Sequence, residues 1–208
     1  TTAQISKIGS AQISALSATQ ISAIESQDVA SLTTDQISTL TATQVRALSS
    51  SQLVAMTTAQ ISKIGTQQIA ALNAAQLSAL QTEDLAQLTQ AQVQSISASA
   101  LQAMTTAQVS SLSAAKLAML TTSQVRALTA DQIKALNASN FSDMSSAQFA
   151  ALTATQAAVL TTAQISNLST SQLAGIANTS VAAMTTAQLA AINSTKVEKM
   201  TAGQIRSM

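Results

Sequence analysis

Few side chains in this sequence have the type and spacing that chemistry requires. Ser113 and Lys116 match S-x-x-K, a motif in which the serine hydroxyl acts as a nucleophile. Glu83 and Asp84 are the one pair of adjacent acidic residues, and carboxylates are ligands for hard metal ions. The chain has no His and no Cys. This excludes a Ser-His-Asp triad, a thiol nucleophile, the usual zinc sites and a disulfide framework.

Charge and aromatic content narrow the possible functions further. Charged residues make up 8% of the chain, aromatic residues 1%, and the net charge is +1. Nucleic-acid binding usually needs a basic surface or rings on which bases stack. No apolar run approaches the roughly 20 residues that span a bilayer. We therefore expect no nucleic-acid partner and no membrane insertion.

The elements that would position any site come from an eight-residue repeat. The 208 residues form 26 octads from Thr1 onward, without insertion or deletion. Position 4 is Gln in 19 octads, position 5 is apolar in all 26 (Ala157 being the one small residue), and position 8 is always Leu, Ile or Met. The unbroken frame predicts a single array over residues 1–208, with no linker or domain boundary.

Neither a continuous helix nor a strand suits this period. Eight residues of helix exceed two turns by about 80°, so the apolar pair would wind around a long helix. In a strand, positions 5 and 8 would face opposite sides. One short helix per octad, broken and restarted, remains as the interpretation that fits.

The start of each helix is marked by a capping box. Position 1 is Ser or Thr in 18 octads, and with Gln at position 4 it spells S/T-x-x-Q. The apolar position 8 of the preceding octad and position 5 then form a hydrophobic staple. Helices this short are unstable alone and must stack. The sequence predicts an all-α solenoid whose positions 5 and 8 line a continuous inner core.

The glutamine column at position 4 has two possible roles. The simpler one is to complete the capping box, and we favour it from the sequence. The other is a ladder in which each amide also bonds the backbone of an adjacent coil. Octads that depart from Gln would be weak points of such a ladder, namely Asp28, Asp84, Ala100, Lys116, Asn140, Ser180 and Lys196.

The candidate chemical residues all fall within this frame. Ser113 is a position 1 and Lys116 a position 4, so a helix cap accounts for their spacing. Glu83 and Asp84 lie in a first helical turn, where carboxylates suit the helix dipole. We therefore predict no catalytic, cofactor or metal site, no cofactor and no enzymatic activity.

Two groups of charged residues need separate mention. The densest charge cluster is expected to be a solvated face and consists of Lys196, Glu198 and Lys199. Three arginines occupy position 6 at intervals of ten octads, and would align if ten octads make whole turns: Arg46, Arg126 and Arg206. Neither terminal octad is a polar cap, so we expect end-to-end self-association.

The octad resembles known bacterial repeat arrays. Residues 160–168, L-T-T-A-Q-I-S-N-L, resemble the repeated octapeptides of large exported or surface proteins of the adhesin type. Residues 40–48 resemble the first helix of transcription-activator-like effector repeats, but share only the capping box. The first resemblance implies an extracellular or cell-surface location.

The resulting hypothesis is a non-enzymatic structural module, a spacer or stalk of a large bacterial surface or secreted protein. A protein- or glycan-binding surface made of positions 3, 6 and 7 is one alternative. The other is a Thr-rich ice-binding surface, which would need a regular threonine array. Paired threonines fill positions 1 and 2 in only seven octads.

Overall fold

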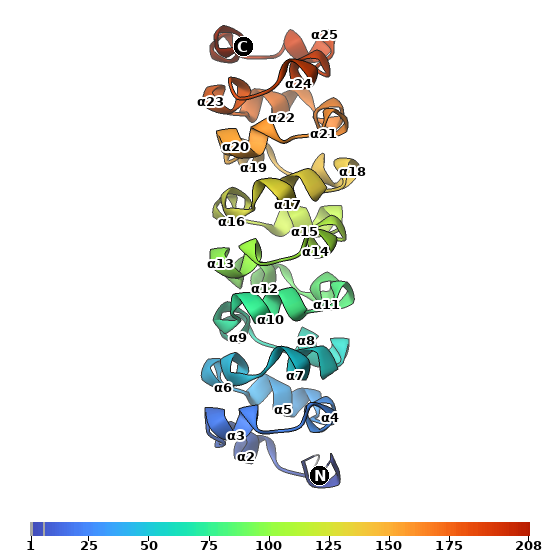
Figure 1. Ribbon diagram of the computed structural model, residues 1–208, viewed down its shortest axis with the longest axis vertical. Helices are drawn as coiled ribbons and strands as arrows, with labels where there is room; N and C mark the ends of the chain where they lie inside the picture. Colours follow the sequence, from blue (N-terminus) through green and yellow to red (C-terminus); the bar gives the residue numbers. More distant parts are fainter. Residues whose placement is uncertain (1, 6) are drawn as a thin grey trace. The chain divides into compact units, whose positions relative to one another are not determined.

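The computed structural model describes residues 2–5 and 7–208, and every octad contributes one short helix. These residues contain 26 helices of four to six residues and no strand (Figure 1). The all-α fold class predicted from the capping boxes is confirmed.

The chain divides into two compact units, Thr1–Met104 and Thr105–Met208, and each is described by itself. The division falls between two octads, and both units follow the same frame. A single array over residues 1–208 stays a prediction. The helices of the first unit are α1 (Thr2–Ile5), α2 (Ser10–Ser14), α3 (Ala18–Ser22), α4 (Ser26–Ala30), α5 (Thr34–Thr39), α6 (Ala42–Ala47), α7 (Ser50–Ala55), α8 (Thr58–Ser62), α9 (Thr66–Ala71), α10 (Ala74–Ala79), α11 (Thr82–Gln87), α12 (Gln90–Ser95) and α13 (Ala98–Gln102).

The second unit repeats this arrangement with thirteen helices among its residues. They are α14 (Thr106–Ser110), α15 (Ala114–Met119), α16 (Thr122–Ala127), α17 (Ala130–Ala135), α18 (Ala138–Phe141), α19 (Ser146–Ala150), α20 (Ala154–Ala158), α21 (Thr162–Asn167), α22 (Thr170–Gly175), α23 (Asn178–Val181), α24 (Thr186–Ala190), α25 (Ser194–Val197) and α26 (Ala202–Ser207).

Helix α6 shows how one octad starts and stops a helix. Thr41 is extended, with φ −73° and ψ 160°, and its hydroxyl accepts the backbone N–H of Gln44 at 3.2 Å. The Gln44 Oε1 accepts the Thr41 N–H at 2.7 Å, which completes the capping box. Leu48 returns the chain to an extended conformation with ψ 137° and ends the helix. Position 8 thus closes one helix and precedes the cap of the next.

Helices three octads apart lie side by side. In the first unit α6 packs on α9 and α4 on α7, and in the second unit α19 packs on α22 and α20 on α23. Within each unit the chain therefore winds back next to itself after three to four octads. This is the solenoid-like packing that short helices require, because each one buries its apolar face on its neighbours.

Burial follows octad position. Positions 5 and 8 are buried through most of each unit, as predicted, and positions 3 and 6 are mostly exposed. Position 4 is also buried wherever it is Gln from Gln36 onward. Phe141 and Phe149 take position 5 in consecutive octads and meet edge to face, with ring centroids 4.9 Å apart. Ala157, the next position 5, is fully buried.

Candidate functional site

The buried glutamine column is the most regular polar feature of both units. Gln76, in α10, shows the pattern. Its Oε1 accepts the Asn73 backbone N–H at 2.9 Å, which caps its own helix. Its Nε2 donates to the carbonyl oxygens of Val45 at 2.9 Å and Leu48 at 2.7 Å, at the end of α6. One side chain thus joins the start of a helix to the end of the helix four octads earlier.

The same bond recurs along both units, and we call it the glutamine ladder. In each case Nε2 donates to the position-8 carbonyl oxygen 28 residues earlier. That carbonyl lies just past a helix end, where no helical N–H reaches it. The glutamines concerned are Gln36, Gln44, Gln52, Gln60, Gln68, Gln76, Gln92, Gln148, Gln156, Gln164, Gln172, Gln188 and Gln204.

The structure therefore shows both roles that the sequence left open. The cap uses the amide oxygen and the ladder uses the amide nitrogen, so neither role displaces the other. Our preference for the cap alone was wrong. A buried amide has to satisfy both its donor and its acceptor, and this arrangement satisfies both with backbone atoms.

Two octads that lack Gln keep the donor half of the ladder, and in a third a lysine donates to a different carbonyl of an earlier coil. Asn140 Nδ2 donates to the Leu112 carbonyl at 2.9 Å, and Ser180 Oγ donates to the Leu152 carbonyl at 2.8 Å. Lys196 Nζ donates to the backbone carbonyl of Ser166, 30 residues earlier. These three octads lack the capping box, and each forms a helix of only four residues. Asn140 and Ser180 thus keep the ladder bond and lose the cap, whereas Lys196 replaces the ladder bond with another contact to an earlier coil.

Octad 11 uses two side chains, one for its cap and one for a bond to a position-6 carbonyl of an earlier coil. Asp84 Oδ2 accepts the Gln81 backbone N–H at 3.2 Å, so the carboxylate supplies the cap. The Gln81 side chain, at position 1, donates to the Val54 carbonyl at 3.4 Å. The sequence analysis missed this exchange. Its signal was the rare Gln at position 1 in an octad with Asp at position 4.

The S-x-x-K pair has the structural role that the frame predicts. The Ser113 hydroxyl accepts the Lys116 backbone N–H at 3.3 Å and is the N-cap of α15. Lys116 is half-buried, and desolvation by burial lowers the pKa of its amine. A hydroxyl that accepts a helix N–H is held in place by the cap.

The acidic pair is split between surface and interior. Glu83 is exposed and its carboxylate accepts the Thr82 hydroxyl at 3.0 Å, whereas Asp84 is buried. Among residues 2–5 and 7–208, no three acidic, His or Cys side chains gather as metal ligands would. Asp84 instead belongs to the cap of α11.

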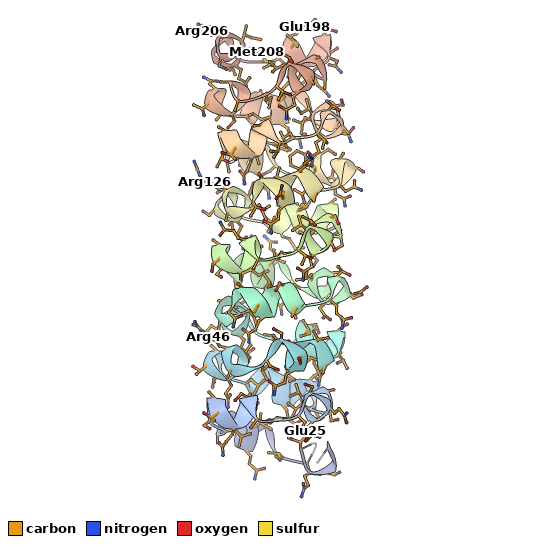
Figure 2. All side chains as sticks on the ribbon, viewed as in Figure 1. Glu25, Arg46, Arg126, Glu198, Arg206 and Met208 are labelled. Atoms are coloured by element: carbon orange, nitrogen blue, oxygen red, sulfur yellow. The ribbon has the colours of Figure 1, made fainter. Side chains whose placement is uncertain are left out.

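The other charged residues lie mainly at the surface. Glu198 and Lys199 are exposed, as expected of a solvated face, but Lys196 is half-buried and its amine donates to the backbone carbonyl of Ser166. Arg126 and Arg206 are exposed and project from the same side of the second unit (Figure 2). Arg46 is exposed in the first unit.

The fold and its hydrogen bonds define the class of the protein: each unit is an α-helical repeat array. The family described as the ALTTAQ repeat matches residues 21–58 and 51–82. Residues 55–60, A-M-T-T-A-Q, lie close to that description and run from the end of α7 to the capping glutamine of α8. The match thus supports a repeat array built on the capping box.

Two further findings complete the comparison. A search of curated proteins found no match to this chain. None of the helices in the described part of the chain has the length and apolar character needed to cross a membrane.

Proposed function

We propose that this chain is a non-enzymatic structural repeat module, a spacer or stalk of a large bacterial surface or secreted protein. The observation that carries the proposal is the glutamine ladder. The glutamine that recurs at position 4 is buried from Gln36 onward, and each ladder glutamine is bonded to the backbone of its own helix and of an earlier coil. The chemistry that the repeat supplies is therefore used to hold neighbouring coils together.

The exposed positions support a passive role. Positions 3 and 6 are mainly Ala, Ser and Thr, which carry neither charge nor a large apolar surface. Binding sites are usually enriched in aromatic and charged side chains, and these make up only 1% and 8% of this chain. Within each unit, octads are bonded to those four octads before them, and the proposed spacer would lengthen as octads are added.

A frame-preserving tandem duplication tests the spacer function. Small-angle X-ray scattering of the 208-residue chain and of its duplicate is expected to give a maximum dimension that doubles. The matched control carries the same duplication with one extra residue at the junction, which displaces the 28-residue bond. A maximum dimension that grows only as the cube root of chain length, as in a compact globule, would refute a spacer.

The surface location has a separate test. The absence of Cys makes the fold independent of the redox state of the compartment. Antibodies against the array are expected to label intact bacteria that produce the parent protein. Labelling that appears only after the cells are permeabilised would contradict a surface or secreted protein.

The ice-binding alternative meets a geometric obstacle. The threonine hydroxyls at position 1, such as those of Thr41 and Thr161, accept backbone N–H groups as helix caps. A spacer is expected to cause no thermal hysteresis in freezing solutions. A protein- or glycan-binding surface would have to be made from the small side chains of positions 3 and 6, and glycan-array binding would favour it.

A further inference from the structure

Five asparagines of the second unit each begin an N-x-S/T sequon, the acceptor motif for N-linked glycosylation. They are Asn137, Asn140, Asn167, Asn178 and Asn193. Asn73, the one asparagine of the first unit, is followed by two alanines and begins no sequon. In a chain so rich in Ser and Thr the motif alone does not single out one asparagine, so the structure has to make the distinction.

Asn137 differs from the other asparagines that start a helix. Its Oδ1 accepts the backbone N–H of Ser139 at 3.0 Å and the Ser139 hydroxyl at 2.7 Å, which forms an Asx turn. The Oδ1 atoms of Asn73 and Asn193 instead accept the N–H of the residue three positions later, at 2.9 and 3.0 Å. Among the described residues, Asn137 is therefore the one sequon asparagine whose oxygen is bonded to the hydroxyl of its own motif.

The position-4 residue of this octad explains the turn. The Asn140 side chain is one methylene shorter than that of Gln. Its Nδ2 still reaches the Leu112 carbonyl at 2.9 Å, but it forms no capping box with Asn137. The N-cap then has a ψ of 129° rather than the 173° of Asn73, and α18 is four residues long. The loss of the glutamine thus leaves the Asn137 oxygen to Ser139.

The atoms that a glycosyl transfer needs are accessible at Asn137. Asn137 and Ser139 are both exposed, and among the described residues the Asn137 Nδ2 donates no hydrogen bond to the protein. The two bonds to Oδ1 stabilise negative charge on that oxygen, so they lower the cost of removing a proton from Nδ2. The nitrogen that remains is a better nucleophile than that of an ordinary amide.

In two other sequons the ladder uses an atom of the motif. The Nδ2 of Asn140 is the nitrogen that a sugar would take, and it is bonded to a backbone carbonyl. The Asn178 sequon ends in Ser180, which is buried and donates its hydroxyl to the Leu152 carbonyl at 2.8 Å. Either site would have to break a ladder bond before it could react.

The remaining two sequons are exposed at their asparagines but arranged differently. In the Asn167 sequon the middle residue, Leu168, is 1% exposed and belongs to the core. The Ser169 hydroxyl that follows it caps α22 by accepting a backbone N–H at 3.2 Å. The Asn193 oxygen caps α25 and is not bonded to the hydroxyl of Thr195.

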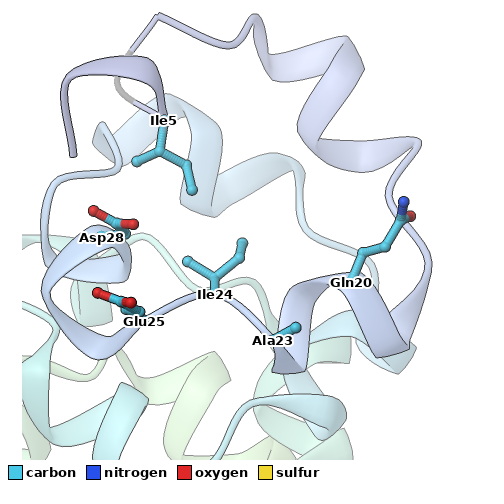
Figure 3. Close-up of a pocket in the computed structure, with 6 residues that line it drawn as sticks. All are labelled: Ile5, Gln20, Ala23, Ile24, Glu25 and Asp28. Carbon is cyan, nitrogen blue, oxygen red and sulfur yellow. The ribbon is translucent and has the colours of Figure 1, made fainter. Parts of the chain in front are cut away.

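A hollow on the first unit has less chemistry to offer. It is lined by six residues, including the carboxylates Glu25 and Asp28 (Figure 3). A metal site gathers at least three acidic, His or Cys side chains, and no such group occurs among residues 2–5 and 7–208. The Asx turn at Asn137 is therefore the stronger candidate for a site.

We propose that Asn137 is an N-glycosylation site, and that its Asx turn selects it among the five sequons. The sugar donor is a glycosyl diphosphate. The anomeric carbon bonds to Nδ2, and its bond to the diphosphate oxygen breaks with the electron pair leaving on the diphosphate. Nδ2 gives one proton to a base of the transferase, and the product is a secondary amide. The proposal does not depend on the spacer function.

Glycopeptide mapping of the parent protein, purified from the bacterium that produces it, is the direct test. Trypsin cuts after Lys134 and Lys196 and leaves all five sequons on one peptide, so a nonspecific protease is needed to separate them. The sugar mass is expected on Asn137, and at most in traces on the other four asparagines. A protein that carries no sugar at Asn137 would overturn the proposal.

Transfer to the purified, folded chain tests the selection. The probe is UDP-glucose with a soluble asparagine N-glycosyltransferase that is active on peptides containing each sequon. Folding is expected to slow transfer at Asn140 and Asn178 by about tenfold or more relative to their peptides, because a ladder bond has to break first. Transfer at Asn137 is expected to be at least as fast as in its peptide. Equal slowing at all three asparagines would contradict the selection.

Asn140→Gln tests the role of the Asx turn, because it leaves the Asn137 sequon intact. Gln at position 4 restores the capping box of octad 10, in which the Asn oxygen accepts the position-4 N–H. Transfer at Asn137 should then slow about two- to tenfold, as expected when a hydrogen bond of ordinary strength is lost. Ser142→Ala is the matched control, since it removes the Asn140 sequon and keeps position 4.

Far-UV circular dichroism checks that both variants fold. Transfer at Asn137 that is equally fast in Asn140→Gln and Ser142→Ala would refute the role of the Asx turn. Slower transfer in Asn140→Gln alone would support it.

Discussion

Replacing Gln76 by Glu separates the two halves of a ladder rung. A Glu at position 4 still accepts the Asn73 N–H and so keeps the capping box. It loses the Nε2 donor that bonds the Val45 and Leu48 carbonyls at 2.9 and 2.7 Å. The substitution changes neither the size of the side chain nor its place in the core. The loss of stability therefore reports the missing donor, together with the cost of burying the new carboxylate when it is ionised.

The expected loss of stability follows from the hydrogen bonds that each carbonyl oxygen retains in the variant. The Leu48 carbonyl has no other donor among the described residues, and an unsatisfied buried acceptor costs about 1–3 kcal/mol. The Val45 carbonyl still accepts the Leu48 N–H at 3.2 Å, so it loses only a second bond, about 1 kcal/mol. The variant should therefore lose about 2–4 kcal/mol, to which burial of the charge adds at neutral pH.

The pH dependence has a definite sign. At a site that is 2% exposed and faces carbonyl oxygens, the pKa of the new carboxyl rises above the ~4.3 of an unfolded chain. The folded state then binds the proton more tightly than the unfolded state. The stability of the variant therefore falls as the pH rises from the unfolded pKa through the higher folded pKa. It returns in part on acidification, because a protonated Glu can donate to the Leu48 carbonyl.

Urea unfolding followed by far-UV circular dichroism measures the loss, and hydrogen exchange locates it. Exchange should accelerate first in α6 and α10, the two helices that the rung joins. Gln67→Glu is the control, because Gln67 is exposed in the first turn of α9, where a carboxylate is tolerated. The reasoning fails if Gln76→Glu is no less stable than Gln67→Glu at neutral pH.

Four other predictions use positions where the octad varies. Gly175→Ala should destabilise by about 1–3 kcal/mol, because its Cβ would lie 2.9 Å from the Ser146 carbonyl oxygen. Gly203→Ala meets only the end of a movable side chain, so thermal unfolding should show no loss or a gain of up to about 1 kcal/mol. Gly65→Thr supplies an N-cap hydroxyl and restricts the unfolded chain, and urea unfolding should show a gain of about 0.5–1 kcal/mol. Burial lowers the pKa of Lys116, so wild-type stability should rise as alkaline pH neutralises the amine. Lys116→Gln should remove that rise in pH-dependent melting and add the missing capping box.

The starts of the helices could be predicted from the sequence because they depend on neighbouring residues. Thr41 and Gln44 are three residues apart, and their cap is formed within one octad. The burial of positions 5 and 8 follows from the same frame, since the staple places both on one side of each helix. Local rules were therefore sufficient for the fold class and for most of the core.

The ladder could not be predicted in the same way. Its acceptors lie 28 residues before each glutamine, and that separation depends on how many octads make a turn. The turn is set by the packing of helices three octads apart, which no single octad encodes. For the same reason, the sequence analysis wrongly placed Lys196 on a solvated face. Its amine donates to the backbone carbonyl of Ser166, 30 residues earlier.

The ladder also gives a physical reason for the unbroken frame. A change at position 4 affects one rung, and Asn140, Ser180 and Lys196 show that a shorter or differently charged donor still reaches a carbonyl. An inserted residue acts differently. It displaces every amide whose acceptor lies on the other side of the insertion, and each bond spans 28 residues. Three or four rungs would therefore lose their acceptors together. The sequence has seven octads without Gln and no insertion. We expect this pattern because a substitution weakens a single rung, whereas an insertion breaks several at once.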